Sequence, residues 1–555
     1  MTPFSGTGFA RQTGRRFAAI PVAGLIAGLT LLAPAWAQTA APGQGVAAPR
    51  LEFTDFEWAL AEAVATDPGL AGFYGSNGLT PVFAGDTGAA RRQALADAVA
   101  HAAEHGLPPA RYALPAGDAA AQGSDPVARA QAELQTARVA ALWVRDLTGG
   151  LLDPSTLAPD IKRKVTRPPL TQVLDRFLKA PDPVAYLAGL GPRDPRYAML
   201  QKALGGGSDL IAPPDAPKAP EVVLRPGQRG PGVADLRARL ASIGFAADSA
   251  DPQLYDQPLA DAVRAYQTRA GLTADGVSGP QTARRLNGGF GPHKRDILIA
   301  LERMRWLGDQ DLNARHVWVN IPEYTAEIRQ DGQRLFQTRV VVGKANNEFH
   351  TPEFSDQMEF VVVNPRWNVP RSITVKEYLP RLQKNPNAVS HLDVVDSRGR
   401  VVPRGQINFG QYTASSFPYR MRQKPSDDNA LGVVKFIFPN PWNIYLHDTP
   451  TKHLFANARR AYSHGCVRVG DPVDLATALL SPQSDDPRGL FDRARASGDE
   501  RWLKLEPPVP VHLVYFTALP DQTGRIRHYA DIYGRDAAVW NGLLRAGLES
   551  GDAEG

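Results

Sequence analysis

The sequence predicts a multidomain α+β protein, and three features of the chain indicate this fold class. The chain has 555 residues, which at about 150 residues per domain gives roughly three to four domains. Apolar residues recur at helical spacing in the first half, and from about residue 314 the period changes to two. Stretches rich in proline, alanine and glycine separate the parts, as linkers do. We therefore expect a linker at 38–50, a helical N-terminal scaffold domain at 51–211, a proline-rich linker at 212–221, a small three-helix domain at 222–288, a mostly-β domain with helices at 289–538 and a C-terminal tail at 539–555.

The composition excludes two classes of protein. Apolar residues make up 43% and charged residues 21% of the chain, which is ordinary for globular proteins and excludes a chain that is disordered throughout. The net charge is +5, and the first 37 residues hold three arginines and no acidic residue, so the remainder carries only +2. No basic run stands out, and we expect no nucleic acid as a partner.

The first 37 residues have the features of an export signal. Arg15 and Arg16 precede an apolar stretch from Phe17 to Leu32, and the small-x-small sequence 35–37 (AWA) matches a cleavage site. A membrane anchor is the alternative, because the uncharged stretch is nearly long enough to span a bilayer. The prolines, the glycines and the cleavage pattern favour a cleavable signal peptide at 1–37, so we expect the protein to act outside the cytoplasm.

The second half of the chain predicts a hairpin and several strands. Residues 327–343 alternate around an Asp331-Gly332 turn, as in a β-hairpin. Further strands are expected at 359–364, 436–438, 443–447 and 511–517. Between about 371 and 432 the alternation weakens, and glycine, proline and aromatic residues are interleaved with charge. An insertion of this length inside a β domain is usually functional, and we expect this lid segment to cover a site.

The chain has a single cysteine, Cys466, which is unusual in an exported protein and indicates a chemical role for its thiol. No intramolecular disulfide and no four-cysteine zinc site is possible. A thiolate nucleophile requires a base or positive charges that lower its pKa, together with donors for an oxyanion. Gly465 would let a substrate carbonyl approach the main-chain N–H groups. His447, at the end of an expected strand, and His464 are both candidates for the base, and the sequence pattern alone leaves the choice open.

No metal site and no cofactor site is expected, because the sequence holds neither a metal-ligand pattern nor a glycine-rich phosphate loop.

Residues 222–288 resemble the peptidoglycan-binding domain type 1 module. The resemblance is carried by Ala262-Val263, Tyr266-Gln267, Gly271-Leu272, Asp275-Gly276, Gly279 and Thr282. It implies a three-helix fold, and more weakly it implies contact with the cell wall, because such modules are sometimes only structural.

Residues 447–469 resemble the signature of the L,D-transpeptidases, the YkuD-type cysteine enzymes of the bacterial cell wall. His447, a spacing of fifteen residues and SHGCVRV at 463–469 form that signature. VNPRWNVP at 363–370, PNPWNIYLHDTP at 439–450 and the segments 515–517 and 531–536 extend it, and with the other domains the chain is similar to the large YcbB-like subgroup. The family fold implies a YkuD-type β-sandwich with helices and a lid insertion at about 371–432.

The resemblance implies roles for individual residues. Cys466 would be the acyl-accepting nucleophile and His447 the general base, with Gly465 and Cys466 supplying the oxyanion-hole N–H groups. Ser463 and His464 would shape the site, Arg468 would orient the loop or a substrate carboxylate, and Tyr445 and Trp442 would line the donor cleft. The substrates would be peptidoglycan stem peptides, with a tetrapeptide donor and a diaminopimelate acceptor, in the periplasm. Carbapenem sensitivity and contacts with other wall-synthesis proteins are further expectations.

Other functions remain open at this point. The same chemistry would serve an L,D-carboxypeptidase or the attachment of a lipoprotein to peptidoglycan. A catalytically silent wall-binding scaffold is an alternative of another class, which the intact histidine and cysteine motifs disfavour. A papain-type endopeptidase fits less well, because the order of cysteine and histidine is reversed.

Overall fold

The computed structural model describes residues 53–115, 123–205, 216–270, 272–287, 291–308, 310–346 and 348–548. The expected signal peptide and first linker lie outside these residues, as do Gly271 and residues 212–215 of the linker expected at 212–221. Every helix and strand given below belongs to one compact unit, Thr54–Gly555.

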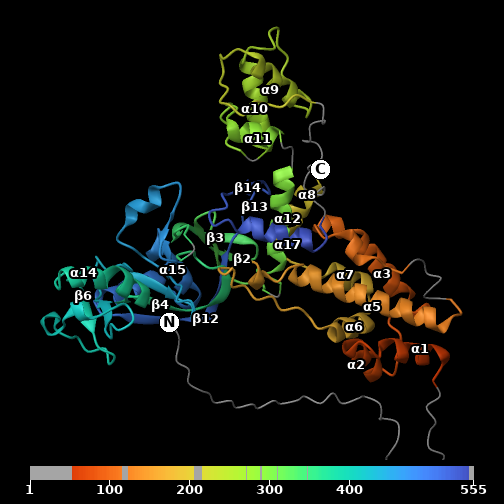
Figure 1. Cartoon of the computed structure of the whole chain (residues 1–555), viewed down its shortest axis with the longest axis horizontal. Coiled ribbons are helices and arrows are strands. Elements are labelled where there is room, and N and C mark those ends of the chain that lie inside the picture. The colour runs from red at the N-terminus through yellow and green to blue at the C-terminus, as the bar shows by residue number, and fades with distance from the viewer. Residues whose placement is uncertain are drawn as a thin grey trace, which may run out of the picture. The chain divides into compact units, whose positions relative to one another are not determined.

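In the described residues, seven α-helices form the N-terminal scaffold domain, which Figure 1 shows in red to yellow. The first begins at a capping box, in which the Thr54 side chain accepts the Glu57 N–H and Glu57 accepts the Thr54 N–H. The longest begins at the Asp125 cap with Pro126 in its first turn, and it runs for 24 residues to Gly149. The helices are α1 (Asp55–Val64), α2 (Pro68–Ser76), α3 (Ala89–Ala100), α5 (Pro126–Gly149), α6 (Leu170–Lys179), α7 (Pro183–Ala188) and α8 (Pro195–Gly205). This region is helical, as predicted.

Three helices make up the small domain, which Figure 1 shows as a bundle of its own. They are α9 (Pro231–Ala241), α10 (Gln257–Arg269) and α11 (Pro280–Asn287), and they enclose a core that includes Leu236, Leu259 and Val263. The buried Gln267 amide bonds Asp275, Val277 and Thr282, so the motif residues between α10 and α11 fold back onto α10. A further helix, α12 (Gly291–Arg305), leads to the sheet.

A nine-stranded sheet forms the centre of the C-terminal domain, in the order β10-β3-β11-β9-β8-β4-β12-β1-β2. The strands are β1 (His316–Asn320), β2 (Thr325–Gln330), β3 (Gln333–Gly343), β4 (Phe354–Val363), β8 (Val434–Ile437), β9 (Leu446–His447), β10 (Ala461–Ser463), β11 (Val467–Val469) and β12 (Arg501–Val514). The predicted hairpin is present as β2 and β3, with Asp331 and Gly332 at φ values of 51° and 72°.

The sheet closes on itself through β3. The first half of β3 pairs with β2, and its last residues pair with β11 and β10. A mostly-β domain is therefore confirmed, and its nine strands form one sheet that closes through β3. The eleven residues of β3 are long enough to join both ends of the sheet. The core includes Val319, Val361, Phe436 and Leu513, and helices α15 (Pro472–Leu480) and α16 (Pro487–Ala496) add Leu475 and Phe491 to it.

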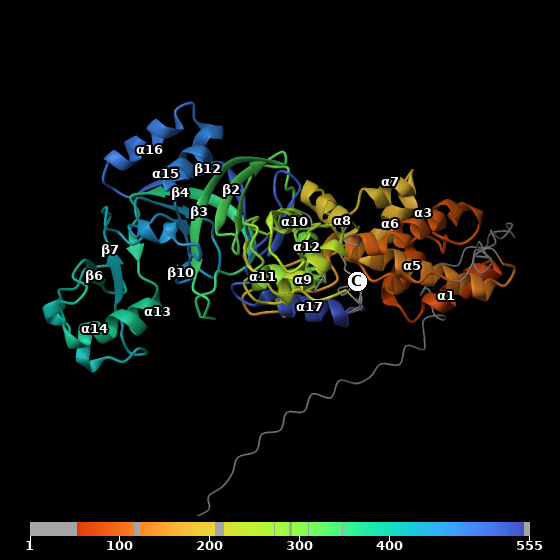
Figure 2. The same ribbon diagram turned by 90° about the horizontal axis from the view of Figure 1, so that it is seen from above.

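The lid segment has a sheet and a core of its own. Strands β5 (Trp367–Asn368), β7 (Arg420–Gln423) and β6 (Leu392–Val395) pair in that order, and the helices are α13 (Arg371–Ile373) and α14 (Leu379–Lys384). Its buried residues include Leu382, Leu392 and Met421. Figure 2 shows α13, α14, β6 and β7 grouped together. This insertion is therefore a folded unit.

The C-terminal end differs from the expected tail. Strands β13 (Ala518–Pro520) and β14 (Ile526–His528) form a two-stranded sheet, and α17 (Arg535–Arg545) follows. Val539 and Leu543 are fully buried against the scaffold core. The chain beyond residue 538 is thus part of the fold as far as Leu548, because α17 has an apolar face that the short sequence pattern did not reveal.

Candidate functional site

Parallel pairing of two short strands brings the two sequence motifs together. Val467 pairs with Leu446 and Arg468 pairs with His447, so Cys466 lies one residue before β11, beside Tyr445. Residues two apart on a strand share a face. Tyr445 and His447 therefore face the same side, and Cys466 and Arg468 are their neighbours on the adjacent strand.

A cavity of about 1180 Å³ lies over this junction. Seven of the eight predicted site residues line the cavity: Trp442, Tyr445, His447, Ser463, His464, Cys466 and Arg468. The eighth, Gly465, lies between two of these residues in the same loop. The lid segment supplies part of the wall through residues such as Trp367, Ile373 and Tyr378. The structure therefore brings the predicted residues together under the lid segment.

Cys466 is half-buried, and its thiol is held by main-chain and tyrosine groups. Its Sγ donates to the Asn443 carbonyl at 3.5 Å. Burial raises the pKa of the thiol to about 11, although hydrogen bonds from the Tyr445 N–H and hydroxyl and the positive charges of Lys435 and Arg468 oppose the shift. The sulfur in the empty site is therefore a thiol at neutral pH.

His447 is 5% exposed, and its ring is oriented by the next residue. Its Nδ1 is hydrogen-bonded to the Asp448 carbonyl. Burial, and then the charge of Arg468, lower the pKa of the imidazole to about 3. The ring is thus neutral, and because a carbonyl only accepts, Nδ1 carries the hydrogen and Nε2 keeps a free lone pair. In the described structure no hydrogen bond joins His447 directly to Cys466.

His464, the other candidate base, has a different partner. Its Nε2 lies 2.8 Å from Glu377 Oε1 of the lid segment. Its ring packs edge-on against Phe349, with 4.6 Å between the centroids. Burial lowers the pKa of His464, and Glu377 opposes the shift. His464 thus connects the cysteine loop to the lid segment, and the free Nε2 of His447 favours His447 as the base.

The loop 463–466 is held by three hydroxyl hydrogen bonds. Ser463 Oγ donates to the Cys466 carbonyl at 2.5 Å and accepts the Gly465 N–H at 3.1 Å. Thr351 Oγ1 donates to the Gly465 carbonyl at 2.7 Å. The Gly465 N–H, expected as an oxyanion donor, is therefore engaged within the loop. The Cys466 N–H is used by no hydrogen bond within the described residues, and it points away from the Gly465 carbonyl because the peptide is planar.

Gly465 adopts a conformation that glycine favours. Its φ is +115°, and a Cβ there would lie 3.4 Å from Ile444 Cδ1. This backbone shape turns the loop between β10 and β11.

Arg468 and Trp442 are each anchored by a contact outside the cysteine loop. Arg468 Nη1 donates to the Thr451 hydroxyl at 3.0 Å, and burial lowers the pKa of its guanidinium. The Trp442 ring packs against Phe354 with 4.7 Å between the centroids. Arg468 thus lies beside His447 on the adjacent strand, where its charge adds to burial in lowering the pKa of the imidazole.

Three residues of the site were missed by the sequence reasoning. Thr351 comes from the loop between β3 and β4 and Lys435 from β8, and neither carries a local motif. Asn440 holds the 440–444 turn through both atoms of its amide, accepting the Trp442 and Ile444 N–H groups and donating to the Phe438 and Ile444 carbonyls. The Asn-Pro-Trp-Asn sequence was a turn signal that would have revealed this role.

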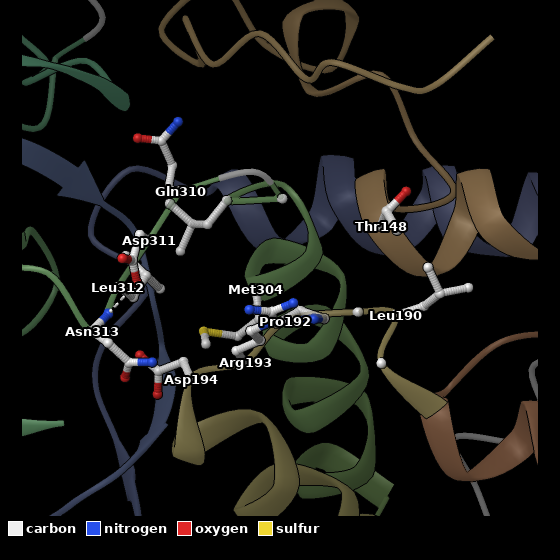
Figure 3. Close-up of a pocket in the computed structure, with 14 residues that line it drawn as sticks. Thr148, Leu190, Pro192, Arg193, Asp194, Met304, Gln310, Asp311, Leu312 and Asn313 are labelled. Atoms are coloured by element: carbon white, nitrogen blue, oxygen red, sulfur yellow. Dashed lines mark hydrogen bonds between the residues drawn. The ribbon is translucent and has the colours of Figure 1, made fainter. Parts of the chain in front are cut away.

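A second cavity, of about 520 Å³, lies near the C-terminal end of α12 (Figure 3). Its lining includes Arg193, Asp194, Met304 and Asp311, and none of the lining residues is a cysteine or histidine. Asp194 is already paired with Arg196 at 2.5 Å. This cavity therefore contains neither a thiol nor an imidazole.

Comparisons with known proteins match three parts of the chain. Residues 314–497 match the family model described as "L,D-transpeptidase catalytic domain" (YkuD). The chain contains an L,D-transpeptidase catalytic domain. Residues 68–204 match the "Scaffold domain" family, and residues 229–286 match the family described as "Putative peptidoglycan binding domain". The predicted family resemblance and multidomain α+β fold are confirmed by these matches and the structure.

A relative from Haemophilus influenzae, named "Putative L,D-transpeptidase", is 36% identical over 225 residues. The match covers 40% of this chain and 45% of the relative, so the chain spans less than half the length of the curated relative it matches.

Two solved L,D-transpeptidases are also similar. That of Xylanimonas cellulosilytica is 17% identical, with 54% of this chain and 100% of the other covered and a TM-score of 0.15. That of Stackebrandtia nassauensis is 16% identical, with 54% and 96% covered and a TM-score of 0.16.

The described residues lack two further features. They hold no group of three or more His, Cys, Asp or Glu side chains placed to bind a metal ion. Within the same residues, no helix has both the length and the apolar character that crossing a membrane requires.

Proposed function

We propose that the protein is a peptidoglycan L,D-transpeptidase that forms 3→3 cross-links through a thioester on Cys466. The observation that carries this proposal is the shared cavity of Cys466 and His447, in which the imidazole is neutral and its Nε2 is free. Both residues lie in the segment that matches the L,D-transpeptidase catalytic domain.

In the first half-reaction, His447 Nε2 takes the thiol proton as Cys466 Sγ attacks the carbonyl of the third residue of a tetrapeptide stem. The carbonyl oxygen becomes an oxyanion, and the Cys466 N–H is the donor available to it. The tetrahedral intermediate then collapses, the bond to the terminal D-alanine breaks, and the imidazolium returns its proton to the leaving amine. A thioester remains on Cys466.

In the second half-reaction, the side-chain amine of a diaminopimelate residue on a neighbouring stem attacks the thioester. His447 accepts the amine proton and transfers it to the departing sulfur, which restores the thiol. Water in place of the amine would give an L,D-carboxypeptidase, and a lipoprotein lysine would give wall attachment. The folded lid segment beside Cys466 favours aminolysis, because it limits the entry of water.

The remaining domains and the location belong to the same proposal. A peptidoglycan-binding domain at 222–288 would hold the enzyme at its polymeric substrate, and a cleavable signal at 1–37 would deliver the protein to the periplasm. We place the catalytic domain at 289–538, extended to α17, with the lid segment at 371–432. Other wall-synthesis proteins are expected partners.

Mass spectrometry and muropeptide analysis test this function. Carbapenem exposure should add one covalent adduct to the wild type and none to Cys466→Ala, and His447→Gln should slow its formation. Purified wild-type protein should produce 3→3 cross-linked muropeptides from wall sacculi, and Cys466→Ala should still sediment with the sacculi. A wild type that binds sacculi but forms neither adduct nor cross-link would indicate the silent scaffold instead.

A further inference from the structure

Lys435 is a cation in the wall of the catalytic cavity that the mechanism above does not use. It lies on β8, where it pairs with His447 of β9 and with Val362 of β4. Paired residues on neighbouring strands point to the same face of a sheet. The Lys435 side chain therefore shares the face of His447, and it lines the same cavity as Cys466.

Aromatic rings hold this side chain in place. Its Nζ lies 5.3 Å from the centroid of the Tyr445 ring and 5.9 Å from that of Trp502. Such cation–π contacts fix an ammonium without neutralising it. Burial lowers the pKa of Lys435, and the negative charges of Glu500 and of a Cys466 thiolate oppose the shift.

The other lysine and arginine side chains of the cavity wall have partners. Lys376 pairs with Glu348 at 3.0 Å, Arg371 donates to two carbonyls of the lid segment, and Arg468 donates to Thr451. For Lys435, the described part of the chain supplies neither an ion pair within 4 Å nor a hydrogen bond. A half-buried ammonium without an anion is costly, and an anion entering the cavity would remove that cost.

We propose that the Lys435 ammonium binds a carboxylate of the substrate and makes the site selective for anionic peptides. This inference rests on the proposed function for the nature of the substrate, a stem peptide that carries carboxylates on diaminopimelate and on the terminal D-alanine. The cation faces the cavity that contains the nucleophile, so the bound carboxylate positions the peptide over Cys466.

Alkylation of the only cysteine tests the anion site without requiring turnover. Iodoacetate, which is anionic, and iodoacetamide, which is neutral, react with the same thiolate. The ratio of the iodoacetate to the iodoacetamide rate constant is therefore independent of the fraction of Cys466 that is ionised, and it measures how strongly the site attracts the anionic probe. We expect Lys435→Met to lower this ratio by about five- to tenfold, as removal of one nearby charge from a half-buried site would. Lys435→Arg should preserve the ratio. Added salt should lower it in the wild type and hardly change it in Lys435→Met.

Lys376→Met is the matched control, because Lys376 lines the same cavity but is already neutralised by Glu348. Its ratio should stay close to that of the wild type. The proposal is overturned if Lys435→Met changes the ratio no more than Lys376→Met does. Equal slowing of both reagents would also overturn it, because Lys435 would then act on the thiolate alone.

Two amidated donors then identify the carboxylate. In Lys435→Met the KM for the unmodified tetrapeptide should rise more than kcat falls. The rise should disappear for the donor amidated at the carboxylate that Lys435 binds, either on diaminopimelate or on D-alanine. An equal rise for both amidated donors overturns the inference. If Lys435→Met lowers the alkylation ratio as expected but the wild-type protein turns over no donor, the proposed function is overturned and the anion site stands.

Discussion

The hydroxyl of Thr351 is expected to control the rate at which Cys466 is acylated, although it makes no hydrogen bond to Cys466 itself. Thr351 is fully buried, its Oγ1 donates to the Gly465 carbonyl at 2.7 Å, and it accepts the Gly343 N–H at 2.9 Å. The Gly465 carbonyl and the Cys466 N–H belong to one planar peptide. Thr351 therefore fixes the direction of the N–H that is available to the oxyanion.

Thr351→Val preserves the shape of the side chain and removes both hydrogen bonds. Two buried main-chain groups lose their partner, which should lower the free energy of unfolding by about 2–4 kcal/mol. Loss of a whole oxyanion donor costs about 10²- to 10³-fold in rate. A misaligned donor should cost less, so we expect carbapenem acylation to slow by about 10- to 100-fold. Intact-mass time courses measure the rate, and urea unfolding followed by tryptophan fluorescence measures the stability.

Thr338→Val separates stability from catalysis. Thr338 is 3% exposed, donates to Asp471 Oδ2 at 2.8 Å and accepts the Asp471 N–H at 3.0 Å. Its loss should destabilise the protein similarly and leave acylation within about twofold, and Thr351→Ser should recover most of the rate. If Thr351→Val lost stability but acylated at the wild-type rate, the account of the Gly465–Cys466 peptide would be refuted.

The remaining predictions concern the thiol, the loop and the lid segment. Because burial raises the pKa of Cys466 to about 11, the rate of iodoacetamide alkylation should still increase with pH beyond pH 9. A plateau already reached by pH 8 would contradict a neutral Cys466 thiol beside a neutral His447 imidazole. Gly465→Ala places a Cβ on a backbone with φ of +115°, so it should lower the free energy of unfolding, measured in urea, by about 1–2 kcal/mol. It should also slow carbapenem adduct formation, measured by mass spectrometry. If neither the free energy of unfolding nor the rate of adduct formation changed, strain at this turn would be excluded. Glu377→Gln weakens the contact between the lid segment and His464, so the ratio of hydrolysed to cross-linked muropeptides should rise, and an unchanged ratio would argue against water exclusion by the lid.

Local periodicity predicted most of the architecture. The helical scaffold, the three-helix domain, the hairpin at Asp331-Gly332 and the mostly-β character of the second half all follow from spacings of a few residues. The closure of the sheet through β3 could not be predicted, because it depends on pairing between strands far apart in the sequence. The same reason explains why Thr351 and Lys435 were missed: Lys435 reaches the cavity through sheet register, and Thr351 bonds Gly465, which is 114 residues away in the sequence.

The strand expected at 443–447 shows where alternation misleads. Only Leu446 and His447 pair as β9. Asn443 has a φ of +54°, and the Asn440 amide takes hydrogen bonds from the turn that would otherwise extend the ladder. A side chain that bonds nearby main-chain groups competes with strand formation. The shortened strand leaves the Asn443 carbonyl free to accept from the thiol.

The register of β9 and β11 explains why the histidine and the cysteine do not form an ion pair at rest. Cys466 neighbours Tyr445, and His447 neighbours Arg468, so the imidazole and the thiol are offset by two residues along the strands, about 6.6 Å. Tyr445 occupies the position next to the sulfur, and Arg468 opposes a positive imidazole. The imidazole and the thiol nevertheless line the same cavity. A neutral histidine there can take a proton from the thiol in one half-reaction and from an amine in the other. An imidazolium paired with a thiolate could not do so, because it would first have to give up its own proton.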